Sequence, residues 1–324
     1  MTSAPPTAVI DVESDLEGHR RELTGYCYRM LGSGFEAEDA VQETFVRAWK
    51  AADRFEGRSS VRSWLYRIAT NVCLDMLRGP QRRARAMDLG GPVSASDGLA
   101  PPLPESAWVQ PMSDDRILPV EGDPADLAAS RESVRLAFVA ALQHLPARQR
   151  AVLILREVLR WQATEVAELL DTTVASVNSA LQRARATLAT CDIEALDSTD
   201  DPEQQALLER YVAAFESYDV ASLVALLRDD VEFSMPPYNM WLQGPDEVAG
   251  WLLGQGIGCK GSRLVATQAN GSAAFGSYRL TRPGLHEPFA LVVVETSGGR
   301  ISGIHNFIDP DLFPAFGLPS RIEG

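Results

Sequence analysis

The spacing of apolar residues divides the chain into a helical part and a mixed part. Residues 12–80 and 133–190 hold good helix formers with few Gly or Pro, and their apolar residues recur at three- and four-residue spacing. From residue 204 on, two amphipathic helical patterns with a turn near Tyr218 are followed by short β-rich runs, which Gly, Asn and Pro turns separate. Helices followed by an antiparallel meander indicate an α+β unit whose helices cover one face of a curved sheet. The pattern therefore predicts a multidomain chain with two all-α helical domains and a C-terminal α+β domain.

Between the two helical regions, residues 88–127 are rich in Pro, Gly, Ser and Asp, a composition typical of a linker. The segment is too long for an ordinary connection inside one compact domain, so we expect it to separate two units as a flexible tether. Trp108, Val109 and Ile117 make it partly apolar, and we expect part of it to dock on another surface. The boundaries we predict are a helical domain over 10–86, a Pro/Gly-rich acidic linker over 87–130, a second helical domain over 131–192, an α+β domain over 203–316 and an unstructured tail over 317–324.

The segment from residue 60 to 78 predicts a helix with two different faces. Its apolar face carries Val61, Trp64, Leu65, Ile68, Val72 and Met76. Its other face carries Arg67, Asn71, Asp75 and Arg78. Arg neutralises phosphate, while Asn and Asp pair with base edges, so the second face suits a nucleic-acid strand with splayed bases. Because Trp64 lies on the apolar face, the simpler interpretation of that residue is a core anchor.

Residues 162–188 have the spacing of a helix-turn-helix. Ala163–Leu170 would be the first helix, Asp171–Thr173 the turn and Val174–Leu188 the recognition helix. Asp171 stands where Gly often lies, but Asp tolerates left-handed backbone and can cap the next helix. The outward-facing residues of the recognition helix include no acid and suit a major groove: Ser176, Asn178, Ser179, Gln182, Arg183 and Arg185. A simple helical hairpin would give the same pattern.

Charge is distributed unevenly along the chain. The 324 residues carry a formal net charge of −14, which argues against a protein that coats nucleic acid indiscriminately. Residues 58–86 nevertheless carry seven Arg and one Asp, whereas residues 87–132 carry nine acids and two Arg. A basic island in an acidic chain can mark a phosphate-contacting surface, although a solvated charged helix face explains the same pattern.

Several classes of protein are disfavoured by the sequence. No stretch approaches ~18 consecutive apolar residues, and the N-terminus lacks the basic and apolar regions of a signal peptide. Cys27, Cys73, Cys191 and Cys259 form no metal-ligand spacing and are typical of reduced, mostly buried thiols. We therefore expect a cytoplasmic protein with no membrane contact, no metal and no cofactor.

Three segments, in this order, resemble the extracytoplasmic-function sigma factors of bacterial RNA polymerase, which belong to the sigma-70 family. They are FEAEDAVQETFVRAWK (35–50), RFEGRSSVRSWLYRIATNVCLDMLR (54–78) and LPARQRAVLILREVLRWQATEVAELLDTTVASVNSALQRAR (145–185), and they cover most of residues 10–190. The resemblance implies a protein that is not an enzyme, binds core RNA polymerase and directs it to promoter −35 and −10 elements. The two helical domains would be sigma region 2 and sigma region 4.

The resemblance also implies roles for individual residues. The first segment would dock on the clamp helices of the β′ subunit through Asp39, Gln42, Glu43, Phe45 and Trp49. The second would melt and read the −10 element, with a flipped base held in the loop Phe55–Ser60, through Phe55, Ser59, Ser60, Arg62, Arg67, Asn71, Asp75 and Arg78. The third would read −35 duplex DNA through the recognition-helix residues named above, and its domain would contact the β flap. The acidic linker would thread towards the polymerase active-site cleft.

Residues 204–316 resemble a SnoaL-like domain, a cone-shaped α+β fold shared with ketosteroid isomerases and polyketide cyclases. MPPYNMWLQGPDEVAGWL (235–252) and FIDPDLFPAFGLP (307–319) look like the C-terminal part of sigma factors that carry this domain. The resemblance implies an in-cis regulator that contacts the sigma domains intramolecularly. A cone of this kind usually encloses an apolar pocket, for which the candidate lining residues are Phe215, Phe233, Met235, Trp241, Trp251 and His305.

Three uses of this C-terminal domain stay open from the sequence. An isomerase or cyclase needs a buried carboxylate or His with a shifted pKa, and Asp230, Glu232 and His305 are the tempting positions. Ligand sensing and a purely protein-contacting role are the other two uses. The alternative to a sigma factor is therefore a SnoaL-type ligand-binding or isomerase/cyclase domain fused to a DNA-binding segment.

Overall fold

The computed structural model describes residues 16–55, 57, 59–79, 83–191, 193–198 and 201–323. They divide into two compact units, the first drawn from the ranges 1–82, 115–134 and 138–192, the second from 83–114, 135–137 and 193–324. The first unit is helical, and the second holds the β-sheet with its covering helices. The predicted fold class, two all-α helical domains plus a C-terminal α+β domain, is therefore confirmed.

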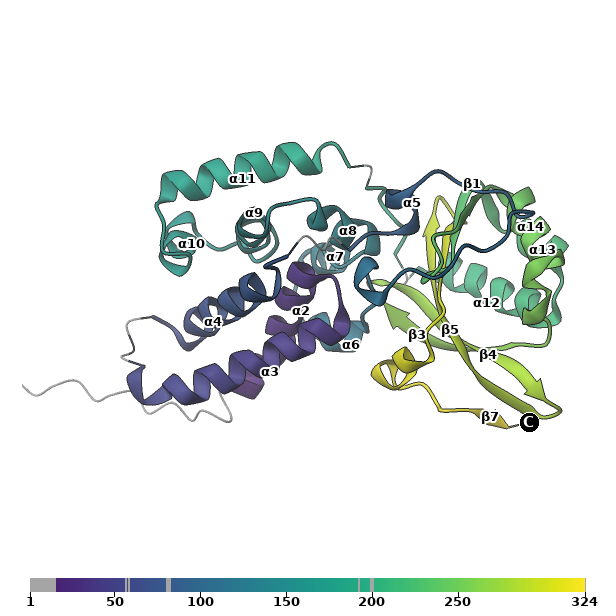
Figure 1. The fold of residues 1–324 in the computed structure, drawn as a ribbon, viewed down its shortest axis with the longest axis horizontal. Coiled ribbons are helices and arrows are strands. Elements are labelled where there is room, and N and C mark those ends of the chain that lie inside the picture. Colours follow the sequence, from purple (N-terminus) through teal and green to yellow (C-terminus); the bar gives the residue numbers. More distant parts are fainter. Residues whose placement is uncertain are drawn as a thin grey trace, which may run out of the picture. The chain divides into compact units, whose positions relative to one another are not determined.

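The N-terminal part of the first unit is a cluster of helices: α2 (Arg20–Leu31), α3 (Gly34–Ala51), the short 3-10 turn η1 (Ala52–Arg54) and α4 (Val61–Met76) (Figure 1). Ser33 and Ser60 begin α3 and α4, because each hydroxyl accepts a hydrogen bond from the backbone N–H three residues further on. Leu23 and Tyr26 of α2 are fully buried. The Tyr26 hydroxyl pairs with Thr70 Oγ1 of α4 at 2.7 Å, so the polar tip of this core ring has a partner.

The rest of the first unit comprises α6 (Asp114–Ile117), α7 (Pro124–Glu132), α8 (Leu136–Gln143), α9 (Ala147–Leu153), the π-helical turn η3 (Ile154–Val158), α10 (Ala163–Leu169) and α11 (Val174–Leu188). The helix-turn-helix is formed by α10 and α11, as the spacing predicted. Asp171 in the turn has a left-handed backbone with φ of 49°, which explains why Asp substitutes for Gly there. The cap of α11 is Thr173 and not Asp171, since Thr173 Oγ1 accepts from the Ser176 N–H.

The second unit is built on one twisted sheet. Its strands are β1 (Leu227–Ser234), β2 (Trp241–Gln243), β3 (Arg263–Ala269), β4 (Ser272–Arg282), β5 (Leu285–Ser297), β6 (Arg300–Phe307) and β7 (Ile322–Glu323). The strand order is β2-β1-β6-β5-β4-β3, with β7 paired to β5. β1 and β6 run parallel, and the other pairs are antiparallel, so the expected meander is interrupted at that one ladder. The parallel pair arises because a helical segment separates β1 and β2 from the β3–β6 meander.

Helices α12 (Pro202–Ser217), α13 (Val220–Val224) and α14 (Pro245–Leu253), with the 3-10 turn η4 (Gln255–Cys259), lie on one side of this sheet (Figure 1). The core between them holds Tyr211 from α12, Trp251 from α14, and Phe275 and Val292 from the sheet. The ring centroids of Tyr211 and Phe275 are 5.8 Å apart. This packing of helices on one sheet face is the α+β arrangement that the sequence predicted.

The segment 83–114 belongs to the second unit rather than forming a free tether. It contains α5 (Ala86–Leu89) and the 3-10 turn η2 (Glu105–Ala107). The Val93 N–H donates to the Trp241 carbonyl oxygen at 2.9 Å, and the Leu103 N–H donates to the Pro237 oxygen at 2.9 Å. Trp108 packs with Trp241 and is almost fully buried. The expectation of partial docking is thus met, whereas the expectation of a flexible tether is wrong for these residues.

Two smaller expectations also differ from the structure. The C-terminal tail, expected to be unstructured, follows the 3-10 turn η5 (Pro310–Phe316) and contains β7, where Ile322 pairs with His286 of β5. At this end of β5 the pairing with β6 has ended, so that edge of β5 supplies the free backbone groups for β7. Trp64, expected as a core anchor, is only half-buried and packs against Phe55, with ring centroids 4.9 Å apart.

Candidate functional sites

The exposed face of α3 presents a stripe that suits a protein partner. Asp39, Gln42, Glu43 and Trp49 are exposed, and Trp49 keeps 69% of its surface accessible. Phe45 is half-buried, with the Arg20 guanidinium 4.8 Å from its ring centre. An exposed Trp beside acidic residues is typical of a docking surface, because aromatic rings are enriched where partners bury them.

One face of α4 exposes Arg67, Asn71, Asp75 and Arg78, as the periodicity predicted. Asp75 forms ion pairs with Arg78 at 2.9 Å and with Arg47 of α3 at 3.4 Å. Both pairs are exposed, so they hold the side chains only weakly and leave the face available to a ligand.

The loop before α4 contributes three further candidate residues. Ser59 is exposed, and Ser60 is partly committed because its hydroxyl caps α4. Phe55 lies against Trp64 and forms with it an aromatic pair at the start of the helix. Two other loop residues, Glu56 and Arg58, lie outside the described residues.

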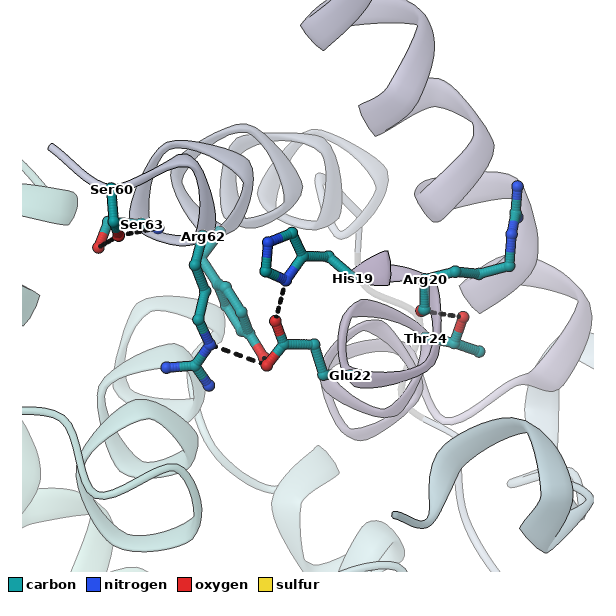
Figure 2. A network of polar contacts seen from close by, with 8 residues as sticks. His19, Arg20, Glu22, Thr24, Ser60, Arg62 and Ser63 are labelled. Atoms are coloured by element: carbon teal, nitrogen blue, oxygen red, sulfur yellow. Dashed lines mark hydrogen bonds and ion pairs between the residues drawn. The ribbon is translucent and has the colours of Figure 1, made fainter. Parts of the chain in front are cut away.

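Arg62 is held by a small polar network that joins α2 to α4 (Figure 2). Its Nε donates to Glu22 Oε2 at 2.8 Å, and Glu22 Oε1 lies 2.6 Å from His19 Nδ1. The guanidinium also lies 5.2 Å from the ring centre of Tyr66 and 5.3 Å from that of Trp161. Arg62 is therefore positioned by α2 on one side and by aromatic rings on the other.

The recognition helix α11 exposes every residue that the sequence assigned to the −35 element. Asn178, Ser179, Gln182 and Arg183 are exposed, as are Ser176 and Arg185. Ser176 Oγ accepts from Thr173 Oγ1 at 3.0 Å, and Arg185 pairs with Glu157 at 2.6 Å in an exposed ion pair. The buried face of the same helix, Val177, Leu181 and Ala184, packs inward. The polar face thus has the form of a major-groove reader.

Within the first unit, the helix-turn-helix also contacts the exposed face of α4 that carries Arg67. Arg67 Nη2 donates to the Glu168 carbonyl oxygen of α10 at 3.0 Å. The Tyr66 and Trp161 rings lie 5.1 Å apart, and Trp161 is only 5% exposed. This contact of Trp161 could not be predicted from the sequence, because a single Trp between two helical patterns gives no signal of its distant partner.

Two buried arginines tie the same helices together. Arg150 of α9 donates to the Met30 carbonyl oxygen and to Gln143 Oε1. Arg29 of α2 donates to Ser133 Oγ at 2.7 Å, and burial lowers the pKa of its guanidinium to about 10. Since a buried charge is costly unless hydrogen-bonded, these contacts fix α2 against the later helices.

The core of the second unit holds a partly open cavity of about 270 Å³. Four of the six residues predicted for a pocket line it: Phe215, Phe233, Met235 and Trp251. Residues that the sequence did not nominate also line it, among them Leu99 from the 83–114 segment, Arg279 from β4 and Asn306 from β6. Leu99 and Arg279 escaped prediction because one was assigned to a linker and the other to an ordinary polar strand position.

Trp241 and His305, the other two predicted pocket residues, lie outside the lining of this cavity. Trp241 packs with Ala86 and Trp108, and its Nε1 donates to the Gly90 oxygen at 2.8 Å. His305 belongs to the opposite face of β6, because side chains alternate along a strand and Ile304 and Asn306 face the cavity. Both residues thus make their contacts away from this cavity.

A buried polar cluster surrounds His305. Its Nδ1 lies 2.9 Å from Ser234 Oγ, and its Nε2 lies 3.3 Å from Glu295 Oε2. Burial opposes ionisation of Glu295, but the His305 hydrogen bond and the charge of Arg85 lower its pKa below the usual range. Burial raises the pKa of the neighbouring Glu232. These groups lie outside the cavity lining, as does Asp230, which is exposed and paired with Arg228 at 2.5 Å.

Among the described residues, no group of three or more His, Cys, Asp or Glu side chains is arranged to hold a metal ion. Within the same residues, none of the helices combines the length and apolarity needed to span a bilayer.

Two family models match the first unit: Sigma-70 region 2 over residues 16–83 and Sigma-70 region 4 over residues 135–188. Together with a relative that is 45% identical along nearly the whole chain, these matches show that the protein belongs to the extracytoplasmic-function (ECF) RNA polymerase sigma factors. The resemblance drawn from the three sequence segments is thereby confirmed.

That relative is the ECF RNA polymerase sigma factor SigG of Mycobacterium tuberculosis strain H37Rv, aligned over 317 residues that cover 96% of this chain and 85% of SigG. SigJ of the same organism is 26% identical over 322 residues, 95% of each chain. The crystal structure of SigJ matches with a TM-score of 0.62 at 23% identity, and covers 95% of this chain and 100% of the SigJ chain. The helical units and the C-terminal α+β domain therefore occur together in a solved sigma factor fold.

Proposed function

We propose that this chain is a promoter-specificity subunit that binds core RNA polymerase, directs it to promoter −35 and −10 elements and carries an in-cis regulator. The observation that carries the DNA-binding part is the acid-free polar face of α11, which is exposed from Ser176 to Arg185. Family membership supports polymerase and promoter DNA as the partners. Its place of action would be the cytoplasm, where transcription occurs.

Different helices would contact polymerase and the two promoter elements. The α3 stripe with Trp49 would dock on the β′ clamp helices, and the region 4 domain would contact the β flap. The α4 face with Arg67, Asn71 and Arg78 would line the single strand of the −10 element, with a flipped base near Phe55. Arg183 and its neighbours on α11 would read the −35 duplex.

The structure supports a closed form as the resting state. Arg67 donates to Glu168, and Arg62 lies against Trp161, so the helix-turn-helix covers part of the −10 face. A DNA strand reaching these two arginines would have to displace α10. Promoter recognition in this proposal therefore begins with separation of the helix-turn-helix from α4.

The C-terminal unit would regulate initiation by holding the acidic segment 83–114. Backbone hydrogen bonds at Val93 and Leu103, and the buried Trp108, fix this segment on the α+β domain. If the segment must enter the polymerase cleft, the same residues cannot stay docked. Deleting residues 204–324 should then raise transcription, whereas loss of all activity would show that the domain activates.

Run-off transcription with purified core polymerase on a promoter pool tests the main proposal. Full-length protein should select a promoter, and Arg183→Ala should lower that transcript about fivefold or more, since one good base contact contributes about 1–3 kcal/mol. The matched control is Arg321→Ala, an exposed arginine of the C-terminal unit, which should leave the transcript unchanged. Failure to direct polymerase to any promoter would reject the proposal.

A ligand-binding role for the C-terminal domain is the second candidate, and the mostly apolar cavity in its core favours it. A catalytic role has less support, because Asp230, Glu232 and His305 all lie outside the lining of that cavity. We accordingly assign no reaction to this domain.

A further inference from the structure

The wall of the C-terminal cavity is apolar except for a few groups, of which Arg279 is the charged one. Tyr211, Phe215 and Trp251 contribute aromatic surface from the helices. The Arg279 guanidinium stacks 3.6 Å from the ring centre of Phe289, and Nη2 lies 3.6 Å from Cys259 Sγ. The cavity therefore combines a hydrophobic body with a cationic end.

The contacts of Arg279 with Phe289 and Cys259 leave part of its guanidinium without a hydrogen-bond acceptor. Its Nε is buried and has no hydrogen-bond partner. Among the residues that the structure describes, no carboxylate forms an ion pair with it. A buried guanidinium N–H without an acceptor is costly, and an anionic oxygen is the acceptor that satisfies it best.

Part of the rim of the cavity is formed by the 83–114 segment. Leu99 lines the cavity, and Val93 and Ala95 pack against the surrounding core. The Ala95 N–H donates to Glu247 Oε2 at 2.5 Å, and Gln255 Nε2 donates to the Asp97 carbonyl oxygen at 2.7 Å. Side chains of α14 and η4 thus hold this stretch by its backbone, which lets Leu99 act as part of the wall.

We propose that the cavity binds a small apolar molecule ending in a carboxylate, with Arg279 as the partner of the carboxylate and Leu99 as the lid. A volume of about 270 Å³ is near the lower limit of small-molecule pockets, about 300 Å³. The size suits a medium-chain fatty acid or a two-ring aromatic acid. The apolar part lies among the aromatic rings, and the charge lies at the Arg279 end.

The ligand and the docked segment stabilise each other in this arrangement. Leu99 contributes contact surface to the ligand only while residues 93–103 stay on the domain. Coupling between two binding events is reciprocal, so a ligand that gains affinity from Leu99 holds the segment in place by the same factor. The effect of the ligand on transcription rests on the proposed in-cis regulation. The bound acid would lower initiation by keeping residues 93–103 on the C-terminal domain and away from polymerase.

Titration calorimetry on the full-length chain tests the site with defined compounds. The acids are decanoate and 2-naphthoate, and each is compared with its neutral alcohol, decan-1-ol and 2-naphthalenemethanol. At least one acid should bind about tenfold or more tightly than its alcohol, because a charged hydrogen bond is gained. Equal affinities, or no binding by either acid, would overturn the proposal without any variant being needed.

Variants at Arg279 localise the effect. Arg279→Gln should abolish the preference for the acid, and Arg279→Lys should restore part of it, with thermal unfolding used to verify the fold. The matched control is Arg282→Gln, an exposed arginine three residues further along β4. If Arg282→Gln and Arg279→Gln weaken the acid equally, the guanidinium of Arg279 is not its partner.

The lid is tested by Leu99→Ala, with Val120→Ala as a control at a position that is 76% exposed. Leu99→Ala should weaken the acid about fivefold, and the acid should slow hydrogen exchange of the Ala95 amide by a similar factor. Tight binding with unchanged Ala95 exchange would refute the lid. Binding and protection without any change in run-off transcription would instead refute the regulatory consequence, so the two failures are distinguishable.

Discussion

The contact between α4 and the helix-turn-helix gives the sharpest prediction. Trp161 is 5% exposed and lies against Tyr66 and Arg62 of α4. Replacing Trp161 by Ala removes both contacts and leaves in place the side chains that we propose to read the promoter. We expect Trp161→Ala to shift the first unit from the closed form to an open one and to raise transcription.

The magnitude follows from the two contacts. An aromatic pair at this spacing contributes about 0.5–1.5 kcal/mol beyond burial, and a cation–π contact contributes about 0.5–1 kcal/mol. Their loss of about 1–2.5 kcal/mol changes the closed-to-open ratio roughly 5- to 60-fold. Trp161→Ala also costs packing energy inside the helix-turn-helix, so the variant should unfold at a lower temperature.

Trp161→Phe is the matched control for this experiment. Phe keeps a ring beside Tyr66, and it sacrifices no hydrogen bond, because Trp161 Nε1 has no partner. The assay is the distance between labels at Val46 on α3 and Ala186 on α11, both exposed and outside the proposed DNA contacts, measured together with run-off transcription. If Trp161→Ala has the same distance distribution and the same transcript yield as Trp161→Phe and the wild type, this contact does not hold the closed form.

Three further predictions concern stability. Glu295→Gln should lower the free energy of unfolding by about 2 kcal/mol at pH 7, because it removes a charged partner of His305 and Arg85. Because the pKa of Glu295 is lowered in the folded state, this contribution is present above the unfolded pKa of about 4.3 and is lost as the pH falls through the folded pKa. The free energies of unfolding of the variant and the wild type, measured by urea titration, should therefore converge in acid. Glu232→Gln should raise the free energy of unfolding at pH 7, because burial raises the pKa of Glu232 and the folded state therefore disfavours its charged form. A lower melting temperature of this variant at pH 7 would contradict the prediction. Asp171→Gly should stabilise the first unit by about 0.5–1 kcal/mol, since Gly adopts the left-handed φ of 49° without steric cost, and an unchanged or lower melting temperature would show that the Asp side chain contributes to the turn.

Local patterns predicted the helices and their exposed faces well. The 3.6-residue period placed Arg67, Asn71 and Arg78 on one exposed face of α4, and the helix-turn-helix spacing placed α10 and α11 within a residue of their bounds. Trp64 was placed on an apolar face but is only half-buried, because helical periodicity predicts the face on which a side chain lies and not how deeply it is buried. The assignment of individual side chains to DNA or polymerase stays a prediction.

The amino-acid order by itself determined the helical regions, the α+β class of the C-terminal domain and membership of the sigma factor family, because these depend on periodicity and on motifs that are contiguous in sequence. Only the tertiary structure decided that residues 83–114 join the C-terminal unit, that Leu99 and Arg279 line its cavity and that Trp161 covers Arg62. Each of those facts pairs groups far apart along the chain. Composition marks such a segment as polar or apolar, but the surface on which it packs is chosen by shape and by hydrogen-bond partners that exist only once the chain has folded.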